Sequence, residues 1–508
     1  MTGQLRAMQR AGLVDLRRPD ELVRTARVMR VFGPIAGGIR TAARRTPHRV
    51  ALVDGDLRVS YRDLDRRTDA IAARWHADGR TAHDTIGVLC PDGIRLVETT
   101  AAAAKLGARL VLLNTGFGAA QLRDVLAREQ VDALVVDPEL AARVGDLGDI
   151  TLLDTAGAEL GARAPVPARQ GGFVLLTGGT TGTPKGAPRR VESPLAGAQF
   201  VDRVPMRRGQ TVLLCAPLFH GTALSQFILA LNLGSTVVLH GKFDAARALA
   251  QIAEHRADMI VLVPTMLRRI LDLGPEALSA TDTGSLRIVF TAGAALPSAL
   301  GTRAIETFGP VIYNFYGCTE TGTATIATPQ DWLAAPGTVG KAPVGITVAL
   351  FDGDTEVTEP GVVGTVHVGN SIAFHGYSGG GSKQLRGGLM STGDLGHFDA
   401  GGRLFIDGRD DDMIVSGGEN VFPGEVEDLL YTHPAIIEAA VIGVPDAEFG
   451  QRLAAFVVRA GDLDADTVRA YVKSALARFK APRDVVFVDE LPRTPTGKID
   501  RRGLAALG

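Results

Sequence analysis

A chain of 508 residues is too long for one compact hydrophobic core, so two or more domains are expected. With 45% hydrophobic residues, 22% charged residues and a formal net charge of −2, the composition is that of an ordinary globular protein without a basic domain for nucleic acid. The three cysteines, Cys90, Cys215 and Cys318, are far apart, which predicts neither a disulfide framework nor a metal site and fits a reducing cytoplasm.

Residues 1–32 are rich in arginine and carry scattered apolar side chains. We interpret them as a basic helical extension, one or two short helices packed on the body of the protein. The alternative is peripheral contact with anionic lipid, which would suit a fatty substrate. Since the sequence has no apolar run long enough for a transmembrane segment and no apolar signal core, we expect a cytoplasmic protein, with peripheral membrane contact as the alternative.

The segment 33–407 is predicted to form a large α/β domain. Short apolar runs alternate with helical periodicity, first over residues 48–140 and again over 211–316. Strands are expected at 85–89, 110–113, 133–136, 211–216, 259–263 and 288–291, and helices at 96–106 and 119–128. From about 337 to 407 the helical pattern vanishes and short strands such as 365–368 and 404–406 remain, which indicates a small β-rich, barrel-like subdomain.

A polar break at residues 408–411 predicts a hinge, followed by a cap domain over 412–508. The cap is expected to be α+β, with its elements at 424–431 (helix), 439–444 (strand), 454–458 (strand), 465–479 (helix) and 485–488 (strand). The predicted fold class is therefore α/β: two α/β subdomains and a small β-barrel-like subdomain in the N-terminal domain, then a small, mobile α+β C-terminal domain.

The most informative segment is Thr177–Gly186, which follows the apolar strand pattern Phe173–Leu176. A turn of glycines and threonines after a strand leaves backbone N–H groups unpaired, and with hydroxyls and one lysine it suits a polyphosphate. It is not a Walker A loop, because Pro184 precedes Lys185 and Gly186 follows it. Taken alone, a flexible turn is an equally good reading.

Five further segments follow in order: Ala216–Gly221, Tyr316–Glu320, Ser391–Asp394, Gly408–Asn420 and Pro492–Lys498. The ordered set resembles the adenylate-forming (AMP-binding) superfamily, which includes acyl-CoA synthetases, adenylation domains of peptide synthetases and beetle luciferases. It is most similar to the acyl-CoA synthetase or fatty-acid CoA ligase branch. The resemblance extends from about Phe32 to Lys498 and implies a site in the cleft between a large domain and its cap.

The resemblance implies two half-reactions, with ATP and coenzyme A as co-substrates and Mg²⁺ as cofactor. A carboxylate attacks the α-phosphate of ATP and expels pyrophosphate, and the thiol of coenzyme A then expels AMP. The carboxylate is already ionised at neutral pH and needs no general base, so the task is electrostatic. The nucleotide-binding residues it implies are Thr177, Gly178, Gly179, Thr180, Thr181, Gly182, Lys185, Gly293, Ala294, Ala295, Asn314, Phe315, Tyr316, Gly317, Thr319, Asp394 and Arg409.

Three residues are the catalytic candidates. Lys498 would bridge the substrate carboxylate and the α-phosphate, although without the motif it would be read as a solvated lysine near the chain end. Glu320 would hold Mg²⁺, with the Thr177 hydroxyl as second ligand; outside the motif it would be a surface carboxylate. His220 lies either where the acid passes or in the core, and the two readings weigh equally. Cys318 is assigned only packing.

For the second half-reaction, the resemblance implies that the cap rotates about Asp411. This rotation would withdraw Lys498 and bring the coenzyme A residues Ser416, Gly417, Gly418 and Glu419 to the site. A stretch with two glycines has little bulk, so a pantetheine arm could pass close to its backbone.

Substrate class rests on the segment after Phe219. No acidic residue follows to pair with an amino group, which argues against a peptide synthetase, and residues 220–238 are small and aliphatic. This favours a medium- or long-chain fatty acid, although a helix packed in the core would look the same. The alternatives are transfer to a carrier protein, a ligase for an aromatic acid, and a non-catalytic nucleotide- or lipid-binding homologue. The residues at three places, Gly178, Gly387–Met390 and Gln451, differ from those that the family usually has there.

Overall fold

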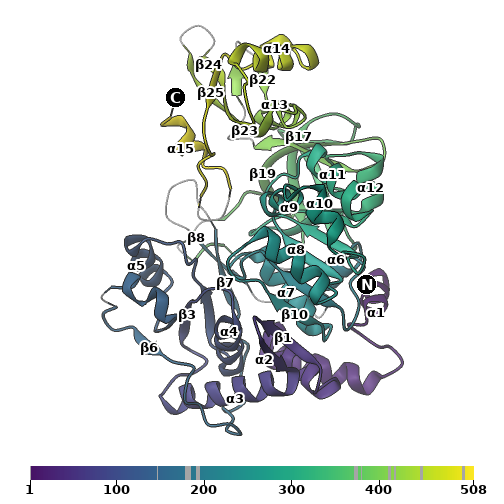
Figure 1. Ribbon diagram of the computed structural model, residues 1–508. Helices are drawn as coiled ribbons and strands as arrows, with labels where there is room; N and C mark the ends of the chain where they lie inside the picture. The colour runs from purple at the N-terminus through teal and green to yellow at the C-terminus, as the bar shows by residue number, and fades with distance from the viewer. Residues whose placement is uncertain are drawn as a thin grey trace.

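The computed structural model describes residues 2–145, 147–177, 185–189, 195–370, 376–378, 380, 382–409, 414–416, 419–446, 450–494 and 498–507. A large N-terminal domain carries a smaller C-terminal domain at the top of Figure 1. The predicted α/β class, with a large N-terminal and a small C-terminal domain, agrees with this architecture.

The first sheet of the N-terminal domain has six strands in the order β6-β5-β3-β4-β7-β8. All neighbours are parallel except β7 and β8. Its strands are β3 (Thr85–Leu89), β4 (Arg109–Leu112), β5 (Ala133–Val136), β6 (Thr151–Leu153), β7 (Phe173–Thr177) and β8 (Lys185–Arg189). The connecting helices are α4 (Ile94–Leu106), α5 (Ala119–Arg128) and the 3₁₀ helix η1 (Pro138–Arg143).

The second sheet has eight strands in the order β14-β13-β12-β11-β9-β10-β1-β2. Only its two outer pairs, β13–β14 and β1–β2, are antiparallel. Its strands are β1 (Val50–Asp54), β2 (Leu57–Ser60), β9 (Thr211–Leu214), β10 (Thr236–Leu239), β11 (Met259–Leu262), β12 (Ile288–Thr291), β13 (Ile312–Cys318) and β14 (Gly322–Ala327). The helices around it are α3 (Tyr61–Ala77), α6 (Ala198–Val201), α7 (Gly221–Asn232), α8 (Ala245–Glu254), α9 (Pro264–Leu271), α10 (Gly274–Ala280), α11 (Ser298–Phe308) and α12 (Pro329–Ala334).

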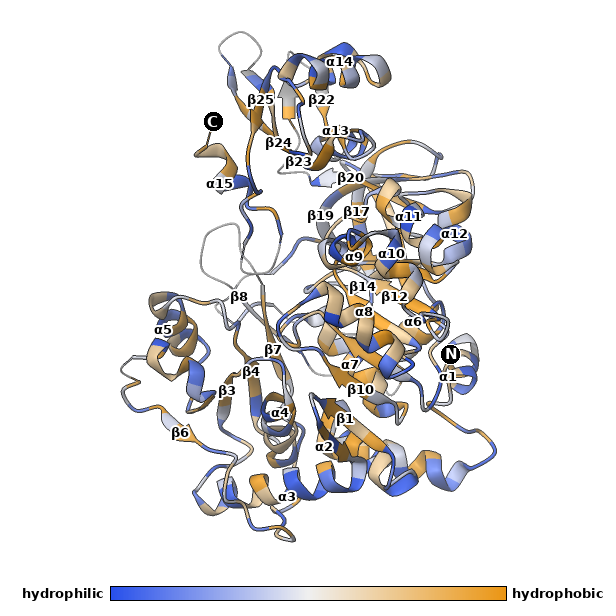
Figure 2. Ribbon diagram, viewed as in Figure 1, coloured by the Kyte–Doolittle hydropathy of each residue, from blue (hydrophilic) through white to orange (hydrophobic). Residues whose placement is uncertain are grey.

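The central parallel strands are apolar along their whole length, because helices cover both faces of such a sheet. Every residue of β3, β11 and β12 is buried, and Figure 2 shows the strands as the most hydrophobic part of the domain. This continuous burial is the physical reason why the strands of both α/β stretches could be located from apolar runs.

The β-rich subdomain is an antiparallel sheet in the order β16-β15-β17-β19-β18, with β20 paired to β19. Its strands are β15 (Thr347–Asp352), β16 (Thr355–Val357), β17 (Gly364–Gly369), β18 (Leu385–Arg386), β19 (Leu389–Phe398) and β20 (Leu404–Arg409). Gly387 and Gly388 form the two-residue turn between β18 and β19, with φ of 54° and 81°. Such a hairpin turn requires positive φ at both positions, which two glycines adopt without steric cost.

The C-terminal domain pairs β21 (Ile414–Ser416), β22 (Glu419–Val421), β23 (Ile436–Asp446), β24 (Gly450–Arg459) and β25 (Asp484–Phe487) in one sheet. Its helices are α13 (Pro423–Leu430), α14 (Ala465–Ala475), η2 (Arg478–Lys480) and α15 (Arg501–Ala505). The helix expected at 465–479 was predicted too long. It ends at Ala475, since Leu476 is extended (φ −121°, ψ 168°) and a separate 3₁₀ turn follows.

The N-terminal extension forms α1 (Thr2–Ala11) and the first part of α2 (Pro19–Arg45). Helix α2 turns back on itself at Gly33, whose φ of 70° and ψ of −178° interrupt the helix just before Pro34. Helix α1 packs on α6 at the edge of the large domain, with Ala7, Met8 and Ala11 buried (Figure 1). Contact of the basic face with anionic lipid stays a prediction. In the part of the chain that the structure describes, no helix combines the length and the apolar character needed to cross a membrane.

Candidate active site

The predicted site residues gather where parallel strands of the large sheet end. His220 follows β9, Val263 follows β11, Gly293 follows β12, and Glu320 follows β13. The carboxyl ends of parallel strands lie at the same edge of a sheet, which is where open α/β folds bind ligands. A cavity of about 2610 Å³ opens at this edge, and these residues line it together with residues of the β-rich subdomain and the cap.

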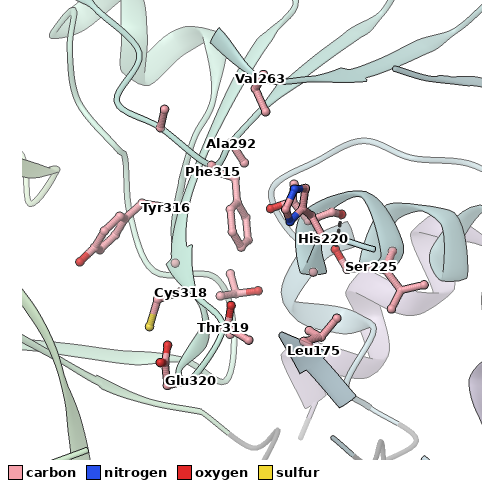
Figure 3. A pocket seen from close by; sticks show the side chains of 18 of the residues that line it. Leu175, His220, Ser225, Val263, Ala292, Phe315, Tyr316, Cys318, Thr319 and Glu320 are labelled. Carbon is pink, nitrogen blue, oxygen red and sulfur yellow. Dashed lines mark hydrogen bonds between the residues drawn. The ribbon is translucent and has the colours of Figure 1, made fainter. Parts of the chain in front are cut away.

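Strand β13 separates two parts of this cavity. Successive side chains of a strand point to opposite faces, and Figure 3 shows Phe315 directed toward His220 while Tyr316 and Cys318 point the other way. Phe315 also stacks with Phe200, with ring centroids 6.2 Å apart. One strand therefore supplies an aromatic wall on the His220 side and polar groups on the opposite side.

On the polar side, Tyr316 and Asp394 form a pair. The Tyr316 hydroxyl donates to Asp394 Oδ2 at 2.6 Å and also contacts Thr392 Oγ1 at 3.2 Å. Burial raises the pKa of Asp394, while the bond from Tyr316 and the nearby charges of Arg409 and Lys498 act in the opposite direction. Asp394 and Arg409 are direct partners across β19 and β20, so the two predicted ribose contacts lie side by side.

Glu320 and Lys185 come together through Tyr377. The Tyr377 hydroxyl donates to Glu320 Oε1, and the Lys185 ammonium lies 5.2 Å from the centroid of the Tyr377 ring. Arg189 donates to the backbone carbonyls of Thr319 and Glu320 and so fixes the turn that carries the carboxylate. A cation and a carboxylate thus face the cavity at the end of the β7–β8 hairpin, as a bound triphosphate would require.

His220 precedes α7 and lines the cavity, with its ring in edge contact with Phe219 at 4.5 Å between centroids. Burial lowers the pKa of His220 to about 4, and the positive charge of Lys498 adds to this effect. His220 is therefore neutral at physiological pH. His220 lines the cavity and is also largely buried, so its place along the path of the acid stays a prediction.

Lys498 reaches the same cavity from the cap. Its carbonyl accepts a hydrogen bond from the Thr494 N–H at 2.8 Å, and Arg493 and Ile499 pair on either side. The Lys498 side chain is exposed, yet its charge acts on both His220 and Asp394. A cation from one domain thus acts on both the aromatic and the polar part of a cavity in the other.

Comparison with known proteins gives the family of this chain. The AMP-binding enzyme family matches residues 39–378, and the C-terminal domain of AMP-binding enzymes matches residues 425–498. The chain belongs to the AMP-binding enzyme family. It is 32% identical to the 2-succinylbenzoate–CoA ligase of Bacillus pumilus, over 91% of this chain and 96% of that protein. It is 33% identical to the feruloyl-CoA synthase of Amycolatopsis sp., over 90% of this chain and 95% of that protein.

A solved structure with the same fold supports this family assignment. The o-succinylbenzoate CoA synthetase of Bacillus subtilis, in complex with its acyl-adenylate intermediate, has a TM-score of 0.82 and 27% identity, and the match covers 92% of this chain and 97% of that chain. The predicted membership of the adenylate-forming superfamily, in its acyl-CoA synthetase branch, is confirmed.

Several residues predicted from the family motifs lie outside the described part of this enzyme. They are Gly178, Gly179, Thr180, Thr181 and Gly182 of the phosphate loop, the hinge Asp411, and Gly417 and Gly418 of the coenzyme A segment. Of Thr177, Ser416 and Glu419 the structure describes the backbone only, in β7, β21 and β22. Their assignments stay predictions.

The other residues predicted to bind the nucleotide also line the cavity: Gly293, Ala294, Ala295, Asn314, Gly317 and Thr319. Asn314 is only 3% exposed, and its amide already donates to the Thr338 carbonyl at 3.2 Å. One N–H group of the Asn314 amide is therefore already bonded within the protein, which leaves fewer groups for a contact with adenine. The Cys318 thiol bonds with Thr321 and burial raises its pKa, in keeping with a packing role.

Few described side chains could act as ligands of Mg²⁺. Among the residues that the structure describes, no group of three or more His, Cys, Asp or Glu side chains is arranged to hold a metal ion. A nucleotide-borne Mg²⁺ keeps several waters and needs only one or two carboxylates. Glu320, a residue that is 9% exposed and lines the cavity, fits that role.

The family motifs did not reveal three residues that shape the site. Tyr377 holds Glu320. Asp92 accepts the Leu218 N–H at 3.0 Å, just before His220, and burial raises the pKa of Asp92 to about 7. Arg268 of α9 stacks 4.5 Å from the ring of Tyr431 in the cap and donates to the Ile437 carbonyl. These contacts join segments distant in sequence and leave no local signal in it.

Proposed function

We propose that this enzyme is an AMP-forming acid–CoA ligase that activates an aromatic carboxylic acid. The observation that carries the proposal is the slot between Phe315 and His220, which opens beside the point where the charge of Lys498 acts (Figure 3). A planar apolar ring suits a slot with aromatic walls. The two relatives described above are named for 2-succinylbenzoate and ferulate, both aromatic acids, and they support this substrate class.

In the first half-reaction, the acid carboxylate attacks the α-phosphate of ATP and pyrophosphate leaves. The protein has to bring two anions together and stabilise charge on the leaving group. Lys498 would lie between carboxylate and α-phosphate, and Lys185 would stabilise the charge on the pyrophosphate. Glu320 would hold Mg²⁺, which neutralises phosphate charge when bound. His220 is neutral and forms a wall for the acid rather than a cation.

In the second half-reaction, the coenzyme A thiol attacks the acyl-adenylate carbonyl and AMP leaves. Lys498 serves no purpose in this step, so the cap is free to rotate about Asp411 and present Ser416–Glu419. Arg268 and Tyr431 are among the contacts that this rotation breaks. Arg268 belongs to the large domain and Tyr431 to the cap, so their contact would be released when the cap turns away.

A fatty acid is the second candidate, and one observation favours it. One face of α7 lines the cavity with Leu224, Ile228 and Leu229, which suits an aliphatic chain. Transfer to a carrier protein instead of coenzyme A is the third, since the adenylation chemistry is the same.

The test offers the protein ATP, Mg²⁺ and a set of acids, with and without coenzyme A, and identifies the products by mass spectrometry. The set contains 2-succinylbenzoate, ferulate, indoleacetate, benzoate and straight-chain acids from acetate to stearate. Aryl-CoA as the main product supports the proposal, and acyl-CoA from straight-chain acids alone overturns the aromatic assignment. Acyl-adenylate that coenzyme A does not consume points to a carrier-protein acceptor.

A further inference from the structure

The cavity continues well past the slot between Phe315 and His220. The face of α7 that lines it runs from the first to the last turn of the helix, through Gly221, Ser225, Ile228 and Asn232. These positions follow helical spacing, so one continuous stripe faces the cavity while Phe227, Ala230 and Leu231 are buried in the core. From His220 to Asn232 the helix rises by about 18 Å, which exceeds the length of a single aromatic ring.

A second part of the lining comes from the turn before α6 and from α6 itself. Phe200, which stacks on Phe315, lines the cavity together with Leu195 and Gly197. A Cβ at Gly197 would lie 3.3 Å from Leu13 Cδ1 and 3.8 Å from Leu229 Cδ1. Leu13 of the N-terminal extension therefore lies beside Gly197, which in turn lies close to Leu229 of α7, and Leu13 lines the cavity.

The N-terminal extension supplies the distal lining. Its apolar contributors to the cavity are Leu5, Met8, Leu13, Val14, Leu22 and Met29. Two hydrogen bonds hold this region in place. Arg208, which follows α6, donates its backbone N–H to the Ala11 carbonyl at 3.1 Å, and the Asn232 amide at the end of α7 donates at 2.9 Å to the carbonyl of Pro34, just after the extension. The match to the family begins at residue 39, so these helices are an addition to the family core.

We propose that the cavity between α7, the α6 turn and the N-terminal helices is a distal acyl subsite that takes a straight hydrocarbon tail of the acid. The proposal rests on the proposed function, because it extends the same acid site. The side chains that line the distal part are mainly aliphatic, which favours a saturated chain over a polar one. The ring of the acid would lie between Phe315 and His220, and its tail would run along the α7 stripe toward Leu13.

The experiment measures kcat/KM for two homologous series, 4-n-alkylbenzoates and n-alkanoates, with tails of increasing length. For the wild type, each added CH₂ that enters the subsite should raise kcat/KM about fourfold, until the tail reaches the N-terminal helices. Leu13→Trp should lower kcat/KM for the longest members at least tenfold relative to the shortest. Leu16→Trp is the matched control, because Leu16 lies in the same segment but is 47% exposed; it should keep the wild-type profile.

A binding assay separates this proposal from the proposed function. Displacement of the fluorescent fatty acid cis-parinarate by each acid reports occupation of the subsite without catalysis. If straight-chain acids are ligated and alkylbenzoates are not, the aromatic assignment fails while the length dependence still tests the subsite. A length profile that is flat in both assays, or equal losses for short and long acids in Leu13→Trp, overturns the proposal. Should Leu13→Trp not fold, Leu13→Ala serves instead, and it should extend the range of accepted tails.

Discussion

The charge state of His220 tests directly which side chain supplies the positive charge in the site. With a pKa of about 4, His220 is neutral near pH 7, so under the proposed mechanism Lys498 and not the imidazole would supply the positive charge near the acid. Replacing His220 by Phe keeps an aromatic wall and removes the titratable group. We expect kcat/KM for adenylate formation to fall by less than tenfold in His220→Phe, because no charge is lost.

The same substitution has a calculable effect on stability. The shift from the ordinary pKa of 6.5 to about 4 corresponds to about 3 kcal/mol against the protonated form. Because the folded-state pKa is lowered, the folded protein binds fewer protons than the unfolded chain between pH 4 and 6.5. The contribution of His220 to the free energy of unfolding is therefore complete above pH 6.5 and falls as the pH decreases, by about 2 kcal/mol at pH 5.

Two measurements check this reasoning. The first is urea unfolding at pH 5 and pH 7.5. On going from pH 7.5 to pH 5, the free energy of unfolding of His220→Phe should rise by about 2 kcal/mol relative to that of the wild type. The ¹H–¹³C signal of the His220 ring, assigned by its absence in the variant, should not titrate between pH 5.5 and 8. A titration midpoint of 6 or higher would show that burial does not keep the ring neutral, and the assignment of the charge to Lys498 alone would fail.

Three further predictions concern the cap and the turn before His220. Lys498→Ala should lower adenylate formation about 10²–10³-fold but leave thioester formation from supplied acyl-adenylate within tenfold, as followed by pyrophosphate release and by acyl-CoA. Arg268→Ala, which removes the contact with Tyr431, should slow adenylation by several-fold more than thioester formation, whereas the exposed neighbour Arg269→Ala should slow neither. Because burial raises the pKa of Asp92 to about 7, the free energy of unfolding of the wild type should fall by about 3 kcal/mol as the pH rises from 4 to 7. Asp92→Asn should abolish this fall in thermal unfolding.

The sequence predicted the α/β elements well wherever burial is continuous. The strand at 288–291 and the helix at 119–128 have the predicted bounds, because fully apolar runs and clear helical periodicity mark them. The helix at 465–479 was too long, since the apolar spacing continues past Ala475 while the backbone does not. The doubling back of α2 at Gly33 was not predicted, because a single glycine before a proline does not specify the direction of the next helix.

For the site, the motifs identified which residues meet but not how they pair. The bond from Tyr316 to Asp394 joins residues 78 apart in sequence, and the bond from Tyr377 to Glu320 spans 57. Tyr377 lies in no motif, and nothing in its local sequence indicates that its hydroxyl holds a carboxylate. Such pairings depend on the packing of the β-rich subdomain against the large sheet, which no local pattern encodes.

Two of the described contacts between the cap and the large domain are of a strength that suits the proposed two-step reaction. Lys498 is held at the cavity by a cap whose described contacts include a cation–π pair, Arg268 with Tyr431, and a hydrogen bond to the Ile437 carbonyl. At a partly exposed boundary these contribute roughly 1–3 kcal/mol together. Under the proposed cap rotation, contacts of this size would favour the closed state during adenylation and would still allow it to open for repeated turnover. Stronger contacts would retain Lys498 where the thiol has to enter.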